Sequence, residues 1–350
     1  MRKIIYILLA IVLVGIAMWR SNTQTEKDIQ NEPYVRLEGT VFHTIYHITY
    51  QSNEDFSADI NRLFKEFDGS LSMFNDTSII TRMNNCDPDV VANSYFKTVF
   101  NKAKEVSDAT DGAFDITVAP LVNLWGFGFK NSENVSQAVV DSILQFVGYK
   151  TVSLDEDGHL HKNDPRTIMD ASSIAKGYMS DIVADFLREH NVENYMVEIG
   201  GEIALNGVNH NGKQWGVGIN KPMEDSTQVN NELQEVLFLS NGGVATSGNY
   251  RNFYYKDGKK YAHTIDPHTG YPIQQDILSS TVIAKDCMTA DAYATAFMVL
   301  GKEKALQVLA NDTTLMAYFI VEGKGENEYD VVYSPALELR LRNSVGASPK

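Results

Sequence analysis

Short apolar runs bounded by turn residues constrain the fold of this chain more than any other feature. Tyr195 to Ile199, Trp215 to Ile219, Val236 to Leu239 and Leu278 to Ile283 have the composition of strands and are bounded by Gly, Asn and Pro. Successive parallel strands need a long crossover connection, usually a helix, whereas turns separate several of these runs. The sequence therefore predicts an α+β fold of mixed sheets flanked by helices, rather than a doubly wound parallel sheet.

Helices are expected where apolar residues recur at helical spacing. Ser172 to Asn191 has this spacing after a serine-rich start that suits an N-cap, and Thr289 to Leu300 is predicted to be capped by Thr289. Asp59 to Phe67 and Ser94 to Ala109 have the same amphipathic pattern. Further strands are expected at Glu38–Tyr50, Val331–Tyr333 and Leu337–Leu341.

The ends of the chain differ in composition from its middle. Residues 1–20 combine a basic start, Met1-Arg2-Lys3, with an apolar run, which predicts a signal peptide or a membrane anchor. Residues 21–37 are predicted to be a flexible tether, 38–333 the folded domain, and 334–350 a closing strand and tail. The chain is therefore expected to be exported, either anchored in the inner membrane and facing the periplasm or otherwise extracytoplasmic. Whether the N-terminal segment is cleaved is left open.

The charge of the chain excludes one class of partner. A formal net charge of −15 and a pI near 4.9 argue against nucleic-acid binding, because phosphate contacts need clustered Lys and Arg. An acidic protein that binds a phosphate must supply local positive charge, from a metal ion, a few cations or helix N-termini.

Two segments carry oxygen ligands suited to a hard metal and a phosphate. Asp291 and Thr295 are four residues apart on a predicted helix and share one face, an arrangement that suits Mg²⁺. The alternative is an Asp that stabilises the helix dipole beside a packed Thr. Asp170 to Gly177 adds a carboxylate, hydroxyls, carbonyls and Lys176 at a strand-to-helix junction, although serine-rich N-caps are common for structural reasons alone.

His263 is the candidate general base of the chain. It precedes the turn at Asp266-Pro267, where an imidazole could reach a cleft, but histidines at strand ends are more often packed. His268 makes no zinc-type pair with it. Cys86 and Cys287 have no metal-type spacing, and whether they pair is left open.

Each signal is ambiguous alone, but together they resemble the ApbE family of flavin transferases, also called FAD:protein FMN transferases. The resemblance runs from Glu38 to about Tyr333. It rests on these segments in this order: Gly39-Thr40, Leu71-Ser72-Met73-Phe74, Asp111-Gly112-Ala113-Phe114-Asp115, Asp170 to Gly177, Gly200-Gly201-Glu202, Ser247-Gly248, His263 to Pro272, and Ala290-Asp291 with Thr295.

This resemblance implies an enzyme that uses FAD as its substrate. The enzyme would cleave the FAD pyrophosphate with Mg²⁺, with Ca²⁺ as the alternative, join FMN through a phosphoester to a Thr or Ser of a partner, and release AMP. The partners would be redox proteins with a Ser/Thr-Gly-Ala-Thr-like segment. The implied fold is related to the tunnelling fold, with an ApbE-like FAD-binding transferase domain at residues 38–333.

The resemblance also assigns residues to roles. His263 and Asp291 would be catalytic, Ser173 would bind the metal through its carbonyl, and Asp291 and Thr295 through side-chain oxygens, with Ala294 beside them. The flavin dinucleotide would be lined by Glu38, Phe74, Ala113, Phe114, Asp115, Asp170, Lys176 and His263. Phe74 stands where the family often has Tyr, and Ala171-Ser172-Ser173 where Leu-Gly-Ala is frequent.

Two other functions remain compatible with the same residues. With water in place of the acceptor hydroxyl, the protein would be a Mg²⁺-dependent FAD pyrophosphatase that produces FMN and AMP. Without any reaction, it would be a non-catalytic exported flavin-binding protein.

Overall fold

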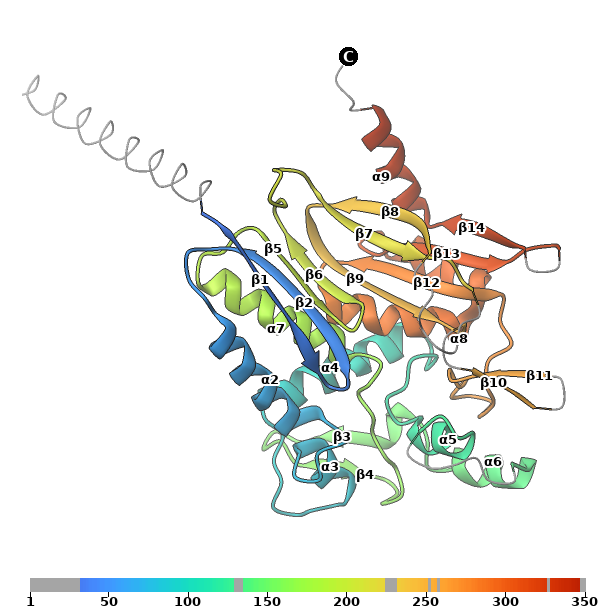
Figure 1. The fold of residues 1–350 in the computed structure, drawn as a ribbon. Helices are drawn as coiled ribbons and strands as arrows, with labels where there is room; N and C mark the ends of the chain where they lie inside the picture. Colours follow the sequence, from blue (N-terminus) through green and yellow to red (C-terminus); the bar gives the residue numbers. More distant parts are fainter. Residues whose placement is uncertain are drawn as a thin grey trace, which may run out of the picture.

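The computed structural model describes residues 32–128, 135–223, 232–250, 253–256, 259–325 and 328–346. At its centre is an 8-stranded sheet in which each neighbouring pair is antiparallel (Figure 1). The strands, in their order across the sheet, are β1 (Tyr34–Val41), β2 (Thr44–Gln51), β5 (Tyr195–Ile199), β6 (Glu202–Asn206), β9 (Asn241–Gly248), β12 (Ile277–Ala284), β13 (Met316–Glu322) and β14 (Tyr329–Tyr333).

Smaller elements surround this sheet. The additional strand pairs are β3 (Val152–Leu154) with β4 (Leu160–Lys162), β7 (Trp215–Asn220) with β8 (Leu233–Leu239), and β10 (Phe253–Lys256) with β11 (Lys259–Ala262). The helices are α2 (Ser57–Leu71), α3 (Ile79–Asn84), α4 (Ser94–Ala109), α5 (Ala119–Leu124), α6 (Gln137–Leu144), α7 (Ala175–Glu189), α8 (Cys287–Asn311) and α9 (Pro335–Gly346). The α+β prediction is confirmed.

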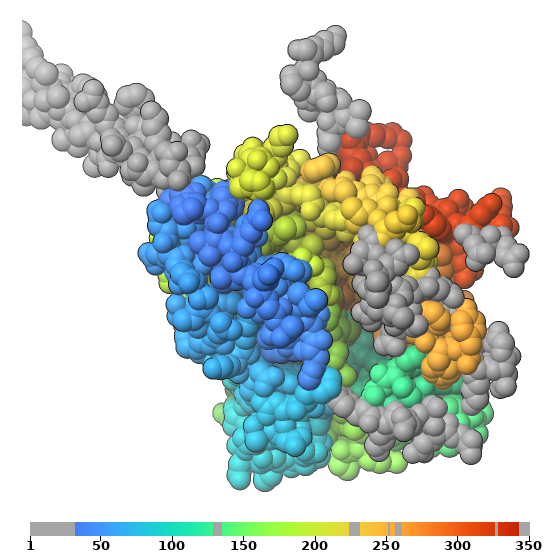
Figure 2. Space-filling view, viewed as in Figure 1, coloured from blue at the N-terminus to red at the C-terminus, as the bar shows by residue number. Residues whose placement is uncertain are grey.

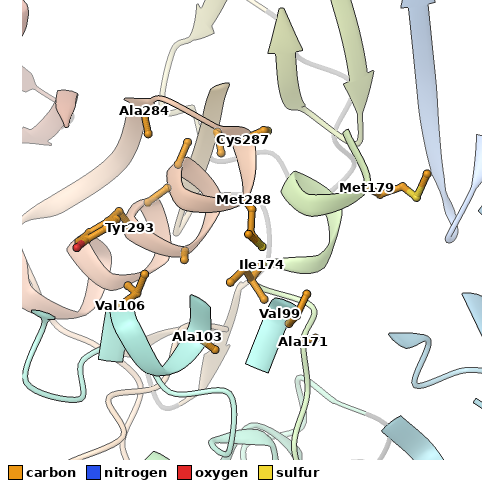
Figure 3. Close-up of a cluster of buried hydrophobic side chains, with 14 of the residues drawn as sticks. Val99, Ala103, Val106, Ala171, Ile174, Met179, Ala284, Cys287, Met288 and Tyr293 are labelled. Atoms are coloured by element: carbon orange, nitrogen blue, oxygen red, sulfur yellow. The ribbon is translucent and has the colours of Figure 1, made fainter. Parts of the chain in front are cut away.

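Both faces of the central sheet are buried, and the alternation along β13 shows how. Ala317 and Phe319 face the cluster that contains α7, α8 and α4, whereas Tyr318 and Ile320 face the cluster that contains β7 and β8. Figure 3 shows part of the first cluster, in which Met288 of α8 points toward Ile174, just before α7, with Val99 of α4 beside them. The helices α7 and α8 are therefore held side by side on one face of the sheet (Figure 1).

The predicted strand Glu38–Tyr50 is in fact a hairpin. β1 and β2 pair through a two-residue turn at Phe42 and His43, which both have positive φ values of 50° and 58°. Such turns usually carry Asn-Gly, so the run of β-branched and aromatic residues concealed this one. The Phe42 ring packs against Phe64 and Phe67 of α2, which holds the turn in place.

The C-terminal prediction was also wrong at one element, because Leu337–Leu341 lies in helix α9. Ser334 precedes the helix, and its hydroxyl accepts a hydrogen bond from the Leu337 amide at 3.4 Å. Pro335 occupies the first helical position, where its missing N–H does no harm. Ser-Pro is therefore a helix start here and not the end of a strand.

The structure describes only part of the predicted N-terminal segments. β1 begins at Tyr34, inside the predicted tether 21–37, and residues 1–31, which include the predicted signal or anchor, lie outside the described residues. Among the residues that the structure describes, no helix is long and apolar enough to cross a bilayer. Cys86 is exposed, Cys287 is buried, and both thiols are free.

Candidate functional site

The site is organised around a close contact between the first turns of α7 and α8. A Cβ on Gly177 of α7 would lie 2.5 Å from the carbonyl oxygen of Cys287 and 2.8 Å from Cβ of Asp291. Only glycine therefore allows this approach. The Gly177 amide donates a hydrogen bond to Oδ2 of Asp291 at 3.0 Å. Asp291 thus satisfies an N–H of the first turn of α7, a task predicted for the serines before it.

Lys176, the neighbour of Gly177, forms the second polar contact of the site. Its Nζ lies 2.6 Å from Oε1 of Glu202, the first residue of β6. The Lys176 side chain is 33% exposed, whereas that of Glu202 is only 6% exposed. The contact therefore joins a nearly buried acid to an ammonium group that still reaches solvent.

The buried charges of this group do not balance. Burial raises the pKa of Asp291 despite the nearby Lys176 ammonium and the Gly177 amide, and burial raises the pKa of Glu202 to about 7 despite the ion pair with Lys176. Burial opposes the charge on Lys176, but Glu202 and Asp291 outweigh it and raise the pKa of the ammonium. Lys176 alone faces the two buried carboxylates of Glu202 and Asp291, so a further positive charge beside them would stabilise their ionised forms.

Asp181 and Asp286 position the start of α8, and the sequence analysis missed both. The Asp181 carboxylate accepts hydrogen bonds from the amides of Cys287 at 2.8 Å and Met288 at 2.7 Å. Asp286 is the N-cap, because its side chain accepts a hydrogen bond from the Thr289 amide at 2.8 Å. The prediction that Thr289 caps this helix was wrong: its hydroxyl is buried and has no hydrogen-bond partner among the described residues.

The acidic turn that follows α4 is connected to the start of α7. The Asp170 amide donates a hydrogen bond to the Ile116 carbonyl at 2.7 Å. Asp115 is 6% exposed, and its carboxylate accepts hydrogen bonds from Thr117 and from the Tyr149 amide, each at 2.7 Å. Burial raises the pKa of Asp115. Both oxygens of this carboxylate therefore accept hydrogen bonds from the protein, which hold Thr117 and Tyr149 around it.

The histidine segment packs on the same acidic turn. Asp266 organises its own turn, and its side chain accepts hydrogen bonds from the His268 amide at 2.9 Å and the Thr269 hydroxyl at 3.0 Å. Nε2 of His268 lies 2.7 Å from the Asp111 carbonyl. His263, just after β11, has a ring-edge contact with Phe127, with centroids 6.5 Å apart. A continuous series of contacts therefore links the His263 segment, the 111–117 turn, the start of α7 and Asp291.

The β1–β2 hairpin also lies beside Gly200 and the Lys176 side chain. A Cβ on Gly200 would lie 3.0 Å from the Thr44 side chain and 3.1 Å from Cδ of Lys176. Phe74 is 67% exposed and contacts the ring of His43 at a centroid distance of 4.7 Å. Figure 2 shows the surface recessed between this hairpin (blue) and β10 (orange). Thr44 and His43 are thus site neighbours that the sequence analysis missed.

Four predicted residues do not present a side chain to this region. Glu38 is exposed on the edge strand β1, opposite His47. Ala113, Phe114 and Ala294 are 2%, 1% and 0% exposed and belong to the hydrophobic core. Any contact that these three make with a ligand would use their main chains.

The donors near Asp291 fit a hard divalent cation. In a regular helix the Gly177 amide would donate to the Ser173 carbonyl, but here it donates to Oδ2 of Asp291. The Ser173 carbonyl therefore accepts no hydrogen bond from the described residues. Oδ1 of Asp291 accepts none from them either. Thr295 lies one turn further along α8, with its hydroxyl 3.2 Å from that of Ser247. Within the described ranges no group of three His, Cys, Asp or Glu could hold a metal. These few protein oxygens therefore suit an ion that keeps water and substrate ligands, as Mg²⁺ does.

A separate cavity of about 280 Å³ opens beside α3 and β4. Its lining includes Met83, Cys86, His159 and Lys162, and none of the predicted site residues. The site described above therefore lies apart from this cavity.

Comparison with known proteins identifies the family. The model of the ApbE family matches residues 42–319. This chain belongs to the ApbE family. The match includes every predicted site residue except Glu38.

Named relatives align with most of this chain. This chain is 37% identical over 306 residues to an FAD:protein FMN transferase of Vibrio cholerae serotype O1. The alignment covers 84% of this chain and 90% of that protein. The chain is also 36% identical to an FAD:protein FMN transferase of Haemophilus influenzae, over 88% of this chain and 92% of that protein.

Solved structures of ApbE-family members have the same fold. The flavin transferase ApbE from Vibrio cholerae superposes with a TM-score of 0.78 at 34% identity, covering 88% of this chain and 99% of that structure. The apo form of the flavinyl transferase ApbE from Pseudomonas stutzeri gives a TM-score of 0.77 at 30% identity, covering 88% and 96%.

Proposed function

We propose that this chain is an FAD:protein FMN transferase. It cleaves the pyrophosphate of FAD, attaches FMN through a phosphoester to a Thr or Ser hydroxyl of an acceptor protein, and releases AMP. The hydrogen bond between the Gly177 amide and Asp291 carries this proposal, because it brings the start of α7, with Ser173 and Lys176, against the face of α8 that bears Asp291. Membership of the ApbE family and relatives with this activity in their names support it.

The reaction is a displacement at the FMN phosphorus. The acceptor oxygen forms a new bond to that phosphorus, the bond from phosphorus to the bridging oxygen breaks, and AMP leaves with the bridging oxygen. His263 takes the proton of the attacking hydroxyl, a role that can contribute about 10²–10⁴-fold to the rate. Lys176 places its positive charge beside the phosphates.

Mg²⁺ is the metal that we propose for this site. Asp291, Thr295 and the Ser173 carbonyl would hold it, and it would neutralise charge on the transferred phosphate, where such reactions gain most of their stabilisation. Ca²⁺ is the alternative ion, and a metal titration with each ion distinguishes them.

Incubation with FAD, Mg²⁺ and an acceptor tests the proposal. The acceptor is a redox protein that carries a Ser/Thr-Gly-Ala-Thr-like segment, and intact-mass spectrometry reads its FMN adduct while chromatography reads AMP. We expect equal amounts of adduct and AMP with the wild-type chain and neither with Asp291→Ala. Free FMN without an adduct would identify a pyrophosphatase, and bound FAD without AMP would identify a flavin carrier.

We further propose that the protein acts outside the cytoplasm, held in the inner membrane by residues 1–20 and facing the periplasm. The basic start and the apolar run after it support this location. Fractionation of cells that express the full chain, followed by protease treatment of spheroplasts, tests it. We expect the chain in the membrane fraction and accessible to protease. Recovery in the cytoplasmic fraction would reject the location.

A further inference from the structure

We propose that Glu202 is a positioning residue that holds the Lys176 ammonium where it meets the pyrophosphate of FAD. The inference rests on the proposed function, since it concerns how the same site recognises its substrate. Glu202 acts through Lys176 and touches no reacting atom.

The backbone at the β5–β6 turn places Glu202 in this position. Gly200 and Gly201 have positive φ values of 66° and 101°, and Ile199 pairs with Glu202 across them. Glycine adopts two positive φ values in a hairpin turn without the Cβ strain that other residues incur. Glu202 therefore begins β6 directly after the turn, with its side chain directed into the protein.

Two contacts then restrict the Lys176 side chain. Its Cδ would lie 3.1 Å from a Cβ on Gly200, so its aliphatic part lies along the turn. Its Nζ lies 2.6 Å from Oε1 of Glu202. The Ser180 hydroxyl, one turn further along α7, donates to the Glu202 carbonyl at 3.0 Å, which fixes the acid to the helix that carries Lys176.

The stability of the fold does not explain this acid. Glu202 is 5% exposed, and its Oε2 is buried without a hydrogen-bond partner among the described residues. A buried carboxylate that is only half satisfied costs folding free energy. Because the Lys176 ammonium still reaches solvent, removal of the acid does not leave a fully buried unpaired charge. What Glu202 supplies is orientation, because Lys176 is 33% exposed and its flexible chain would otherwise extend into solvent.

A double-mutant cycle on FAD binding tests the inference. The variants are Glu202→Gln, which keeps the shape of the acid, Lys176→Met, and the two combined, with FAD affinity measured by quenching of flavin fluorescence. Groups that orient a metal ligand typically contribute about 10- to 100-fold, and we expect a similar range for the group that orients Lys176. We expect Glu202→Gln to weaken FAD binding and to raise KM for AMP release within this range, and to cause no further loss when Lys176 is already Met.

Two further variants separate orientation from folding. Glu202→Leu is expected to unfold at the same or a higher urea concentration than wild type while it binds FAD more weakly. Glu105→Gln is the matched control, because it removes a 2.9 Å ion pair with Lys102 on the surface of α4, and it is expected to leave FAD affinity unchanged.

Two results would overturn the inference. One is an unchanged FAD affinity and KM in Glu202→Gln, and the other is an equal further loss when Glu202→Gln is added to Lys176→Met, because additivity means that Glu202 acts independently of Lys176. Failure of the proposed function looks different. A wild-type chain that binds FAD but forms neither AMP nor an FMN adduct rejects the transferase, and the binding cycle still decides the role of Glu202.

Discussion

Gly177 shows how one residue controls the distance between two helices. Its missing side chain lets the first turn of α7 approach Cys287 and Asp291 at distances that no Cβ would tolerate. We expect Gly177→Ala to lower the free energy of unfolding by about 1–3 kcal/mol, the usual cost of overpacking, and to reduce AMP release from FAD. Urea denaturation and a chromatographic AMP assay measure the two effects.

Gly69 provides the control for this substitution. It lies in α2 with nothing within 4 Å of an added Cβ, so Gly69→Ala should stabilise the chain by about 0.5–1 kcal/mol and leave AMP release unchanged. If Gly177→Ala were as stable and active as Gly69→Ala, the close contact would not matter.

Asp181 makes folding sensitive to pH. Burial raises its pKa from 3.8 to about 7, against the hydrogen bonds from Cys287 and Met288. The folded state then binds the Asp181 proton more tightly than the unfolded state does. The contribution of this group to the free energy of unfolding is therefore complete below about pH 4 and is lost as pH rises through about 7. A shift of this size corresponds to at most roughly 4 kcal/mol. Asp181→Asn should flatten this fall, as measured by urea midpoints at several pH values, and a profile parallel to wild type would refute the assignment.

At the scale of elements, α8 shows which residue starts a helix. Asp286 accepts a hydrogen bond from the Thr289 amide, whereas the Thr289 hydroxyl is buried without a partner in the part of the chain that the structure describes. We expect Asp286→Ala to cost about 0.5–2 kcal/mol, as for other lost N-caps. Thr289→Val keeps the shape and removes an unsatisfied polar group, so it should be neutral or stabilising. Thermal unfolding of both variants checks this order, and the reverse order would restore Thr289 as the cap.

At the scale of the whole molecule, ligand binding should stabilise the assembled site. Under the proposed function, FAD with Mg²⁺ would bind only where α7, α8 and the β1–β2 hairpin are folded together. At ligand concentrations about 100-fold above Kd, binding should add roughly 2.7 kcal/mol to the free energy of unfolding. Calorimetry with FAD and Mg²⁺, and again with EDTA, measures the part that depends on the metal. Asp291→Ala should lose that part, and an equal response in the variant would remove Asp291 from the metal site.

Local patterns predicted the elements well where a residue depends on its sequence neighbours. The predicted bounds of the helix Ser94–Ala109 and of the strand Tyr195–Ile199 are those of α4 and β5. Predictions failed where a partner distant in sequence replaced the usual local signal. The Phe42-His43 turn lacks Asn or Gly because α2 packs on it, and α7 lacks a serine cap because Asp291 satisfies the Gly177 amide.

The amino-acid sequence by itself determined the α+β class and the kind of chemistry, since periodicity and oxygen-rich motifs depend only on residue type and spacing. The tertiary structure decided which groups meet. The ion pair of Lys176 with Glu202 and the hydrogen bond from the Cys287 amide to Asp181 join residues 26 and 106 positions apart. Contacts of this kind exist only after folding has brought α7 against β6 and α8, because their geometry depends on packing and not on any local pattern.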